Sequence, residues 1–240
     1  MKILAIDTSN IPLSVAVLED RALLATITTN IKKNHSITLM PAISDVMKLA
    51  GVKPAELDRI VVAQGPGSFT GLRIGVATAK TLAFTLDCEL VGVSSLAMLA
   101  AGISTNGESD IVPLFDARRN YVFSGLYKND TELVNELPDQ HRELVTWMNE
   151  LKERNRPQIF VGTDVDLFKE QIIDILGDQA QFPASFLNIP QAFVLGLIGK
   201  DKEPVDQETF IPNYLRLTQA ETQWLETHSD KDHNTYVEKI

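Results

Sequence analysis

The chain has 240 residues, of which 44% are hydrophobic, and it carries a formal net charge of −10 at pH 7. This length can bury the core of one large domain or of two smaller ones. The one cysteine, Cys88, excludes an internal disulfide and fits a reducing compartment.

The acidity lies in the second half of the chain. Residues 1–103 carry 9 Lys/Arg against 8 Asp/Glu, whereas residues 104–240 carry 13 against 24. Phosphate contacts dominate affinity for nucleic acids, so an acidic chain without a basic stripe is a poor stand-alone binder of them. The apolar runs are too short for a signal peptide or a membrane-spanning helix. We therefore expect a soluble cytoplasmic protein with no membrane contact.

The first half begins with a three-strand meander. Apolar residues between turn signals predict strands at residues 3–6, 13–18 and 22–27. Helical spacing and capping residues then predict helices at 36–50, 72–86 and 96–101, separated by strands at 60–63 and 90–93.

The corner at residues 65–75, between a predicted strand and a predicted helix, is rich in glycine. Pro66 presets φ for the second position of a tight turn, and Gly67 supplies the positive φ that a type II turn needs at the third. Ser68 or Thr70 can cap the helix that follows. The spacing matches neither a P-loop nor a dinucleotide-binding fingerprint. We expect a structural turn, with a phosphate cradle or a partner-binding corner as alternatives.

Two helix faces in this half are candidates for contact with another subunit. Gly71, Gly75 and Ala79 recur every four residues and line one face with almost no side chain, so another element can approach closely. The helix at 36–50 has two apolar faces, which is more than a surface helix needs. One of these faces is formed by Ile37, Met40, Ile43 and Met47. Packing inside the same molecule is an equally good explanation of both features.

The second half repeats the opening of the first after a polar run at residues 104–109. Strands are predicted at 111–115, 121–127 and 158–162, helices at 144–153, 167–176 and 191–198, and shorter segments near Phe182 and at 210–216. Residues 218–240 are polar and lack sustained periodicity. The sequence therefore predicts one lobe at 1–104, a second at 105–217 and a loosely ordered tail at 218–240.

Two aspartates at strand ends, Asp7 and Asp116, lie in the repeated positions. This pair resembles the skeleton of the actin-like, sugar-kinase and Hsp70 type of ATPase fold, an α/β fold of two duplicated mixed-sheet lobes flanked by helices. In that fold each aspartate leads a phosphate-binding hairpin that usually contains glycine, and here the glycines are missing. The candidates for a vestigial nucleotide site are Asp7, Thr8, Asp116 and Gly162.

A resemblance to the bacterial TsaB (YeaZ) family, within the wider glycoprotease-like (M22) family, extends over residues 1–216. It is carried by Ile6-Asp7-Thr8-Ser9, Asn34-His35-Ser36, the corner at 65–75, Gly92-Val93-Ser94-Ser95-Leu96, Asp116-Ala117-Arg118 and Pro212-Asn213-Tyr214-Leu215-Arg216. The resemblance implies a non-catalytic subunit needed for N6-threonylcarbamoyladenosine modification of the tRNA adenosine beside the anticodon. The helices at about 36–50 and 71–86 would then correspond to the family's dimerisation surface.

The resemblance also implies partners and cofactors. A TsaD-type homologous transferase subunit and a TsaE-type small ATPase would be the partners, with a homodimer when the chain is alone and only indirect contact with tRNA. No cofactor is expected on this chain alone, and the sequence leaves open whether ATP or ADP binds at an interface shared with a partner. The sequence leaves open whether Arg118 and Arg119 are surface charges or partner contacts.

No catalytic residue and no metal site are predicted. The wider family has a pair of histidines four residues apart on a helix, but here Leu39 lies four residues after His35, and a single imidazole cannot hold a metal. No Gly-x-Ser-x-Gly nucleophile elbow occurs either. The alternative function is an independent nucleotide-dependent phosphotransferase or ATPase using Asp7 or Asp116, which rests on fold analogy alone.

Overall fold

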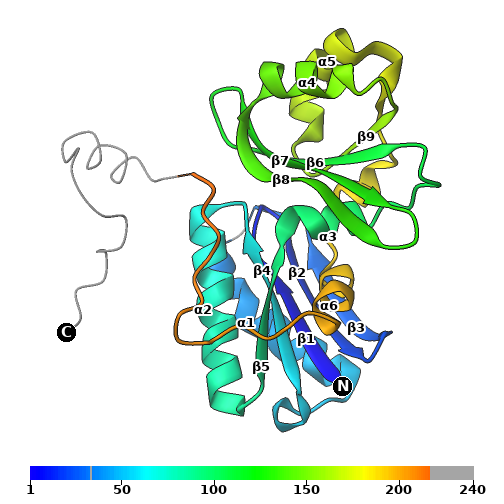
Figure 1. Cartoon of the computed structure of the whole chain (residues 1–240). Helices are drawn as coiled ribbons and strands as arrows, with labels where there is room; N and C mark the ends of the chain where they lie inside the picture. The colour runs from blue at the N-terminus through cyan, green and yellow to red at the C-terminus, as the bar shows by residue number, and fades with distance from the viewer. Residues whose placement is uncertain (33, 217–240) are drawn as a thin grey trace.

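A computed structural model gives the fold of the chain and describes residues 1–32 and 34–216. Two five-stranded sheets, each with helices beside it, form two lobes that lie one above the other in Figure 1. The predicted tail at 218–240 lies outside the described residues. Within the described ranges, no helix is both long and apolar enough to cross a bilayer.

The first sheet contains β1 (Lys2–Asp7), β2 (Leu13–Glu19), β3 (Ala22–Thr29), β4 (Arg59–Gly65) and β5 (Glu89–Ser94). Its order is β3-β2-β1-β4-β5, in which β1, β2 and β3 form the predicted antiparallel meander and β4 and β5 run parallel to β1. β1, β2 and β4 are buried along nearly their whole length. Helices on both faces of the sheet explain why these strands are continuous apolar runs.

The second sheet contains β6 (Asp110–Asp116), β7 (Tyr121–Asn129), β8 (Leu133–Glu143), β9 (Gln158–Val161) and β10 (Ala180–Gln181). Its order, β10-β9-β6-β7-β8, repeats that of the first sheet with β6 in the place of β1. The duplication predicted from the sequence is therefore confirmed. The sequence did not predict β8, because this edge strand contains Pro138 and mostly polar residues and is stabilised by its pairing with β7.

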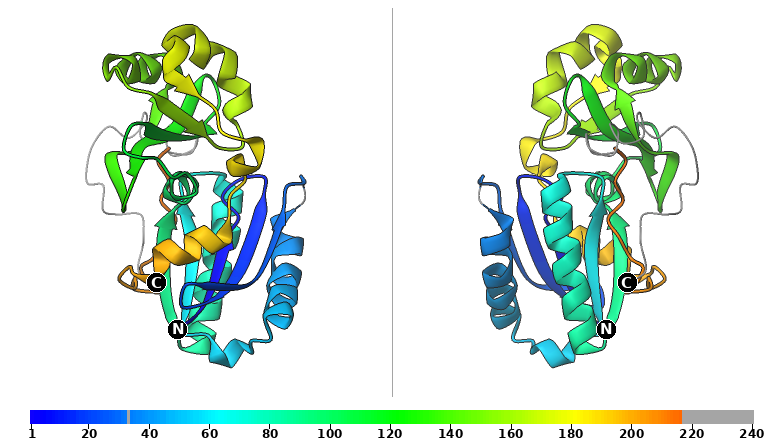
Figure 2. Two further views of the ribbon diagram at one scale, coloured as in Figure 1. Left: turned by 90° about the vertical axis from the view of Figure 1, so that its right-hand side faces the viewer. Right: turned by 90° about the vertical axis from the view of Figure 1, so that its left-hand side faces the viewer.

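Helices cover both faces of the first sheet (Figures 1 and 2). One face packs against α1 (His35–Ala50) and α2 (Phe69–Leu86), and the other against α3 (Ser95–Ala101) and α6 (Ala192–Lys200). The second sheet packs one face on α4 (Leu144–Glu153) and α5 (Val165–Leu176). Its other face packs on α3, which therefore lies between the two sheets and joins the lobes. Single 3-10 turns occur at Pro54–Glu56, Gly177–Gln179 and Ser185–Asn188.

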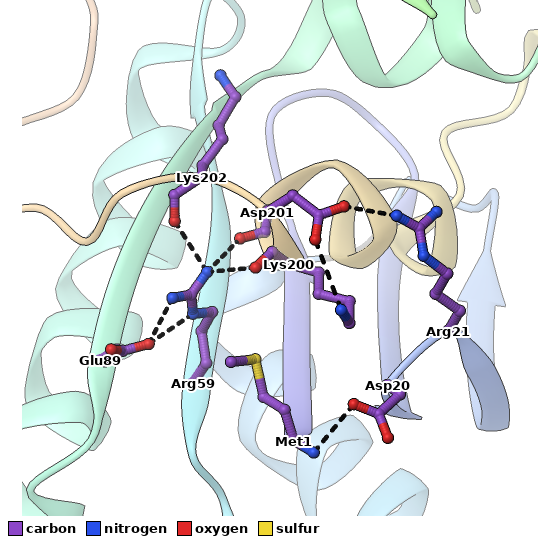
Figure 3. A network of polar contacts seen from close by, with 9 residues as sticks. Met1, Asp20, Arg21, Arg59, Glu89, Lys200, Asp201 and Lys202 are labelled. Atoms are coloured by element: carbon purple, nitrogen blue, oxygen red, sulfur yellow. Dashed lines mark hydrogen bonds and ion pairs between the residues drawn. The ribbon is translucent and has the colours of Figure 1, made fainter. Parts of the chain in front are cut away.

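The position of α6 corrects the predicted lobe boundaries. The sequence places the helix at 191–198 in a second lobe that spans 105–217, but α6 packs on β1, β2 and β4 of the first sheet. The buried side chain of Arg59 holds the end of α6 in place (Figure 3). Its Nη1 lies within hydrogen-bond distance of the carbonyl oxygens of Gly199 (2.8 Å), Lys200 (2.7 Å) and Lys202 (2.9 Å), and because Nη1 carries two N–H groups, two of these carbonyls share one donor. The first lobe is thus built from both ends of the described chain.

The glycine-rich corner forms a turn, but by a different geometry from the one predicted. Gly65 has the positive φ of 117°, whereas Gly67 does not have a positive φ. Gly67 is needed for another reason, since a Cβ at this position would overlap the carbonyl oxygen of Ser9. The predicted cap is present, because the Ser68 side chain accepts a hydrogen bond from the Gly71 N–H at 3.3 Å.

Candidate functional site

A groove lies between α1 and α2 on the first lobe and has a volume of about 500 Å³. We call it the α1–α2 groove. Its lining is largely apolar and includes Met40, Ile43, Met47, Val52, Leu57, Leu82 and Leu86. Lysines at positions 48 and 53 add positive charge to an otherwise hydrophobic surface. Such a groove can accept an apolar side of another protein segment.

The predicted apolar stripe of α1 is divided between the core and the surface. Ile43 and Met47 are buried in the first lobe, whereas Ile37 is 70% exposed and Met40 is 49% exposed. On α2, Phe84 is 81% exposed. These exposed side chains lie on the two helices that border the α1–α2 groove. Of the three, Met40 lines the groove itself. Large apolar side chains exposed on neighbouring helices are characteristic of an interaction surface.

The predicted ridge of small residues on α2 faces inward. Gly71, Gly75 and Ala79 are buried, and a Cβ at Gly71 or Gly75 would overlap the carbonyl or hydroxyl oxygen of Thr8. The Thr8 hydroxyl also donates a hydrogen bond of 2.7 Å to the Gly71 carbonyl. Placing these three residues in a partner-binding surface was therefore wrong, and the alternative of packing within the molecule describes them.

Asp7 ends β1 and is fully buried. Its Oδ1 accepts a hydrogen bond of 2.9 Å from the Ser9 N–H, while Oδ2 has no partner among the described residues. Burial raises the pKa of this carboxyl, with an opposing effect from its hydrogen bonds to Ser9. The Ser9 carbonyl in turn accepts from the Ser68 N–H at 2.7 Å. The hairpin after β1 thus packs against the start of α2.

A cavity of about 730 Å³ lies between the lobes, and only some of the predicted site residues line it. Asp116 and Gly71 line it, whereas Asp7, Thr8 and Gly162 do not. Gly162 has a φ of 142°, and a Cβ there would overlap the Leu114 carbonyl oxygen. Its conformation therefore serves the packing of the second lobe, and of the four predicted nucleotide-site residues only Asp116 lines the cavity.

Asp116 takes part in a hydrogen-bonded turn at the edge of this cavity. Its Oδ1 accepts from the Arg118 N–H at 2.7 Å, and its own N–H donates to Asp164 Oδ2 at 3.0 Å. Asp164 Oδ2 also accepts from Asn10 Nδ2 at 3.2 Å, which connects the two lobes. The Asn10–Asp164 contact was not predicted, because the two residues lie far apart in the sequence.

His35 has a structural position at the start of α1. Its Nε2 lies 2.8 Å from the Asn10 carbonyl oxygen. Among the residues that the structure describes, no group of three His, Cys, Asp or Glu side chains has the arrangement of a metal site. The contact with the Asn10 carbonyl shows that the His35 ring positions the loop after β1.

Comparison with known proteins gives consistent matches to one family. A family model described as TsaD, tRNA N6-adenosine threonylcarbamoyltransferase, matches residues 22–224. The tRNA threonylcarbamoyladenosine biosynthesis protein TsaB of Bacillus subtilis (strain 168) is 43% identical over 95% of this chain and 99% of its own length. TsaB of Escherichia coli (strain K12) is 33% identical over 54% of this chain and 56% of its own length.

Solved structures extend the comparison to the fold. YeaZ from Pseudomonas aeruginosa matches with a TM-score of 0.72 and 28% identity, covering 89% of this chain and 99% of that one. The ethanolamine utilization protein EutJ from Carboxydothermus hydrogenoformans matches with a TM-score of 0.51 and 13% identity, covering 83% and 90%. At this identity the second match concerns the fold alone. With the repeated sheet order, it confirms the predicted actin-like fold.

Proposed function

Because the chain belongs to the TsaB (YeaZ) family of tRNA threonylcarbamoyladenosine biosynthesis proteins, we propose that it is a non-catalytic subunit that binds a TsaD-type transferase through the α1–α2 groove. The observation that carries this proposal is the apolar groove lined by Met40, with Phe84 exposed on α2 beside it. The match to the TsaD family model supports a partner that is homologous to this chain.

A homologous partner would present a corresponding pair of helices. Two such pairs can pack groove to groove and bury Ile37, Met40 and Phe84 of this chain, which removes their apolar surface from water. Two copies of this chain can make the same contact around a two-fold axis. The groove would therefore also form a homodimer when the partner is absent, and the two assemblies would compete.

The arrangement of the aspartates supports the non-catalytic part of the proposal. A nucleotide-dependent phosphotransferase needs its carboxylates at the cavity where phosphate and metal bind. The Asp7 carboxyl is buried outside that cavity, so of the two aspartates only Asp116 lines it, and one oxygen of the Asp116 carboxyl already accepts a hydrogen bond from the Arg118 N–H. ATP or ADP would then bind only at an interface shared with the partner, and a TsaE-type ATPase would join the same assembly.

The test combines binding and activity. Met40→Glu places a charge in the α1–α2 groove, and Ile173→Glu, on α5 of the second lobe and 43% exposed, is the matched control. Burying an unpaired carboxylate at an interface is costly, so Met40→Glu should weaken binding to the TsaD-type partner about tenfold or more. Calorimetric titration measures this affinity, and a reconstituted tRNA threonylcarbamoylation assay measures function.

Two results would contradict the proposal. In the first, Met40→Glu binds the partner and supports modification as well as Ile173→Glu does. In the second, Asp116→Ala abolishes modification although the complex still assembles with normal affinity. The first result removes the α1–α2 groove as the interface, and the second removes the non-catalytic role.

A further inference from the structure

An aromatic pair lies at the end of the second sheet, next to the turn between β6 and β7. Tyr121 stacks on His141 of β8, with ring centroids 4.7 Å apart and an angle of 10° between the planes. The Phe123 ring also packs against His141, with centroids 5.5 Å apart, and helps to fix the imidazole. Tyr121 remains 39% exposed. The pair therefore presents an aromatic ring to solvent on a firm support.

Three arginines belong to the same end of the sheet. Arg118 and Arg119 form the turn before Tyr121 and have φ values of 72° and 55°, in a region that glycine favours. The Arg118 side chain is 82% exposed, and Arg119 is exposed as well. Arg216, from the far end of the described chain, donates a hydrogen bond of 2.7 Å to the Ala117 carbonyl. We call Tyr121, His141 and these three arginines the Tyr121 platform.

The guanidinium groups are only partly neutralised. Arg118 Nε lies 3.9 Å from Asp116 Oδ2, which is a long ion pair. Within the described ranges, Arg119 and Arg216 make no ion pair within 4.0 Å. Glu143, which pairs with Tyr121 across the strands, accepts from the Thr146 N–H at 2.7 Å. The hydrogen bonds to Thr146 lower the pKa of Glu143, so its carboxylate stays charged, and three arginines against the carboxylates of Asp116 and Glu143 leave the platform with a net charge of about +1.

This combination suits one kind of ligand. An exposed aromatic ring stacks on the face of an unpaired base, and nearby arginines contact the phosphates on either side of it. Paired bases in a duplex are already stacked on one another and cannot use such a ring. Burial, with the charge of Arg216 nearby, lowers the pKa of His141, so the supporting ring is neutral at pH 7.

We propose that the Tyr121 platform binds an unpaired nucleotide of RNA, with the base against Tyr121 and the adjacent phosphates against Arg118 and Arg119. The inference rests on the proposed function, which brings the chain to tRNA. Arg118 and Arg216 also line the cavity between the lobes, so a base on the platform would lie at the cavity's edge. The contact is small, and the partner subunit would hold most of the RNA.

The experiment measures RNA binding by fluorescence anisotropy with the full chain, alone and in complex with the TsaD-type partner. The probes are a labelled 17-nucleotide RNA hairpin with seven unpaired loop nucleotides, a fully paired RNA of the same length, and AMP. The variants are Tyr121→Ala, Tyr121→Phe, and the double change Arg118→Ala with Arg119→Ala. Arg21→Ala is the matched control, because Arg21 is 70% exposed and pairs with Asp201 on the first lobe.

The wild type should prefer the hairpin to the paired RNA. Tyr121→Ala should weaken hairpin binding about tenfold, while Tyr121→Phe keeps it because stacking needs only the ring. The double arginine variant should reduce the slope of log affinity against log salt by roughly 0.7 for each phosphate that an arginine no longer neutralises. Arg21→Ala should bind as the wild type does.

The inference is overturned if Tyr121→Ala binds the hairpin as well as Arg21→Ala does, or if AMP binds as tightly as the hairpin. Partner affinity separates this inference from the proposed function. Tyr121→Ala should bind the TsaD-type partner normally, since Tyr121 lies outside the α1–α2 groove. Loss of partner binding by Tyr121→Ala would also overturn the inference, whereas retention of partner binding by Met40→Glu would contradict only the proposed function. Circular dichroism melts of each variant verify that it is folded.

Discussion

Replacing Arg59 by methionine is expected to loosen the attachment of α6 to the first sheet (Figure 3). The Arg59 side chain is 7% exposed, and its Nη1 contacts three backbone carbonyls at the end of α6. Its Nε donates to Glu89 Oε2 at 2.7 Å. Methionine keeps much of the aliphatic volume of the side chain but donates no hydrogen bond.

The expected loss of folding stability is the sum of the costs at the groups that Arg59 contacts. The hydrogen bond to the Gly199 carbonyl is buried, and leaving a buried acceptor without a partner costs about 1–3 kcal/mol. The carbonyls of Lys200 and Lys202 are only partly buried and can accept hydrogen bonds from water, so the loss of each bond costs about half as much free energy. The Glu89 side chain is 46% exposed and stays hydrated, so its contribution is below about 1 kcal/mol. The total is about 2–6 kcal/mol, centred near 4 kcal/mol, which lowers the melting temperature by roughly 12 °C for a chain of this size.

The assay is a thermal melt followed by circular dichroism, combined with hydrogen exchange of the backbone amides of α6. Arg59→Met should increase exchange in α6 more than in β7, because the loss acts first on the end of this helix. Glu89→Gln is the control and should change the melting temperature by less than about 3 °C. The reasoning is refuted if Arg59→Met and Glu89→Gln melt within about 2 °C of each other and show equal exchange in α6.

Two further predictions concern the packing of the loop after β1. Because burial raises the pKa of Asp7, the folded protein holds this proton more tightly than the unfolded chain, and the carboxyl lowers stability as the pH rises above about 4. Asp7→Asn should therefore lose less stability than the wild type between pH 4 and pH 7 in urea unfolding, and an identical pH dependence would show this to be wrong. Gly75→Ala should destabilise the protein by about 1–3 kcal/mol, because the new Cβ meets the Thr8 hydroxyl. The same change in a Thr8→Ala background should cost less, and strict additivity in this double-mutant cycle would exclude the contact as the cause.

Local patterns were sufficient for most of the secondary structure and for the duplication of the fold. The helix predicted at 144–153 is α4 with the same limits, and Ser68 caps α2 as predicted. The two aspartates end β1 and β6, at equivalent places in the two sheets. These features depend on backbone preferences, helix caps and apolar spacing among residues within a few positions of one another. Such local properties can be identified from the sequence alone.

The tertiary structure decided which surfaces are available. The spacing of Gly71 and Gly75 shows that something approaches α2 closely, and only the fold shows that it is Thr8 of the same lobe. In the same way, Ile37 and Ile43 belong to one predicted stripe, yet one is exposed and the other is buried. The return of α6 to the first sheet has no local signal either. Whether a residue is buried depends on contacts between segments that are far apart in the sequence, and no local pattern specifies those contacts.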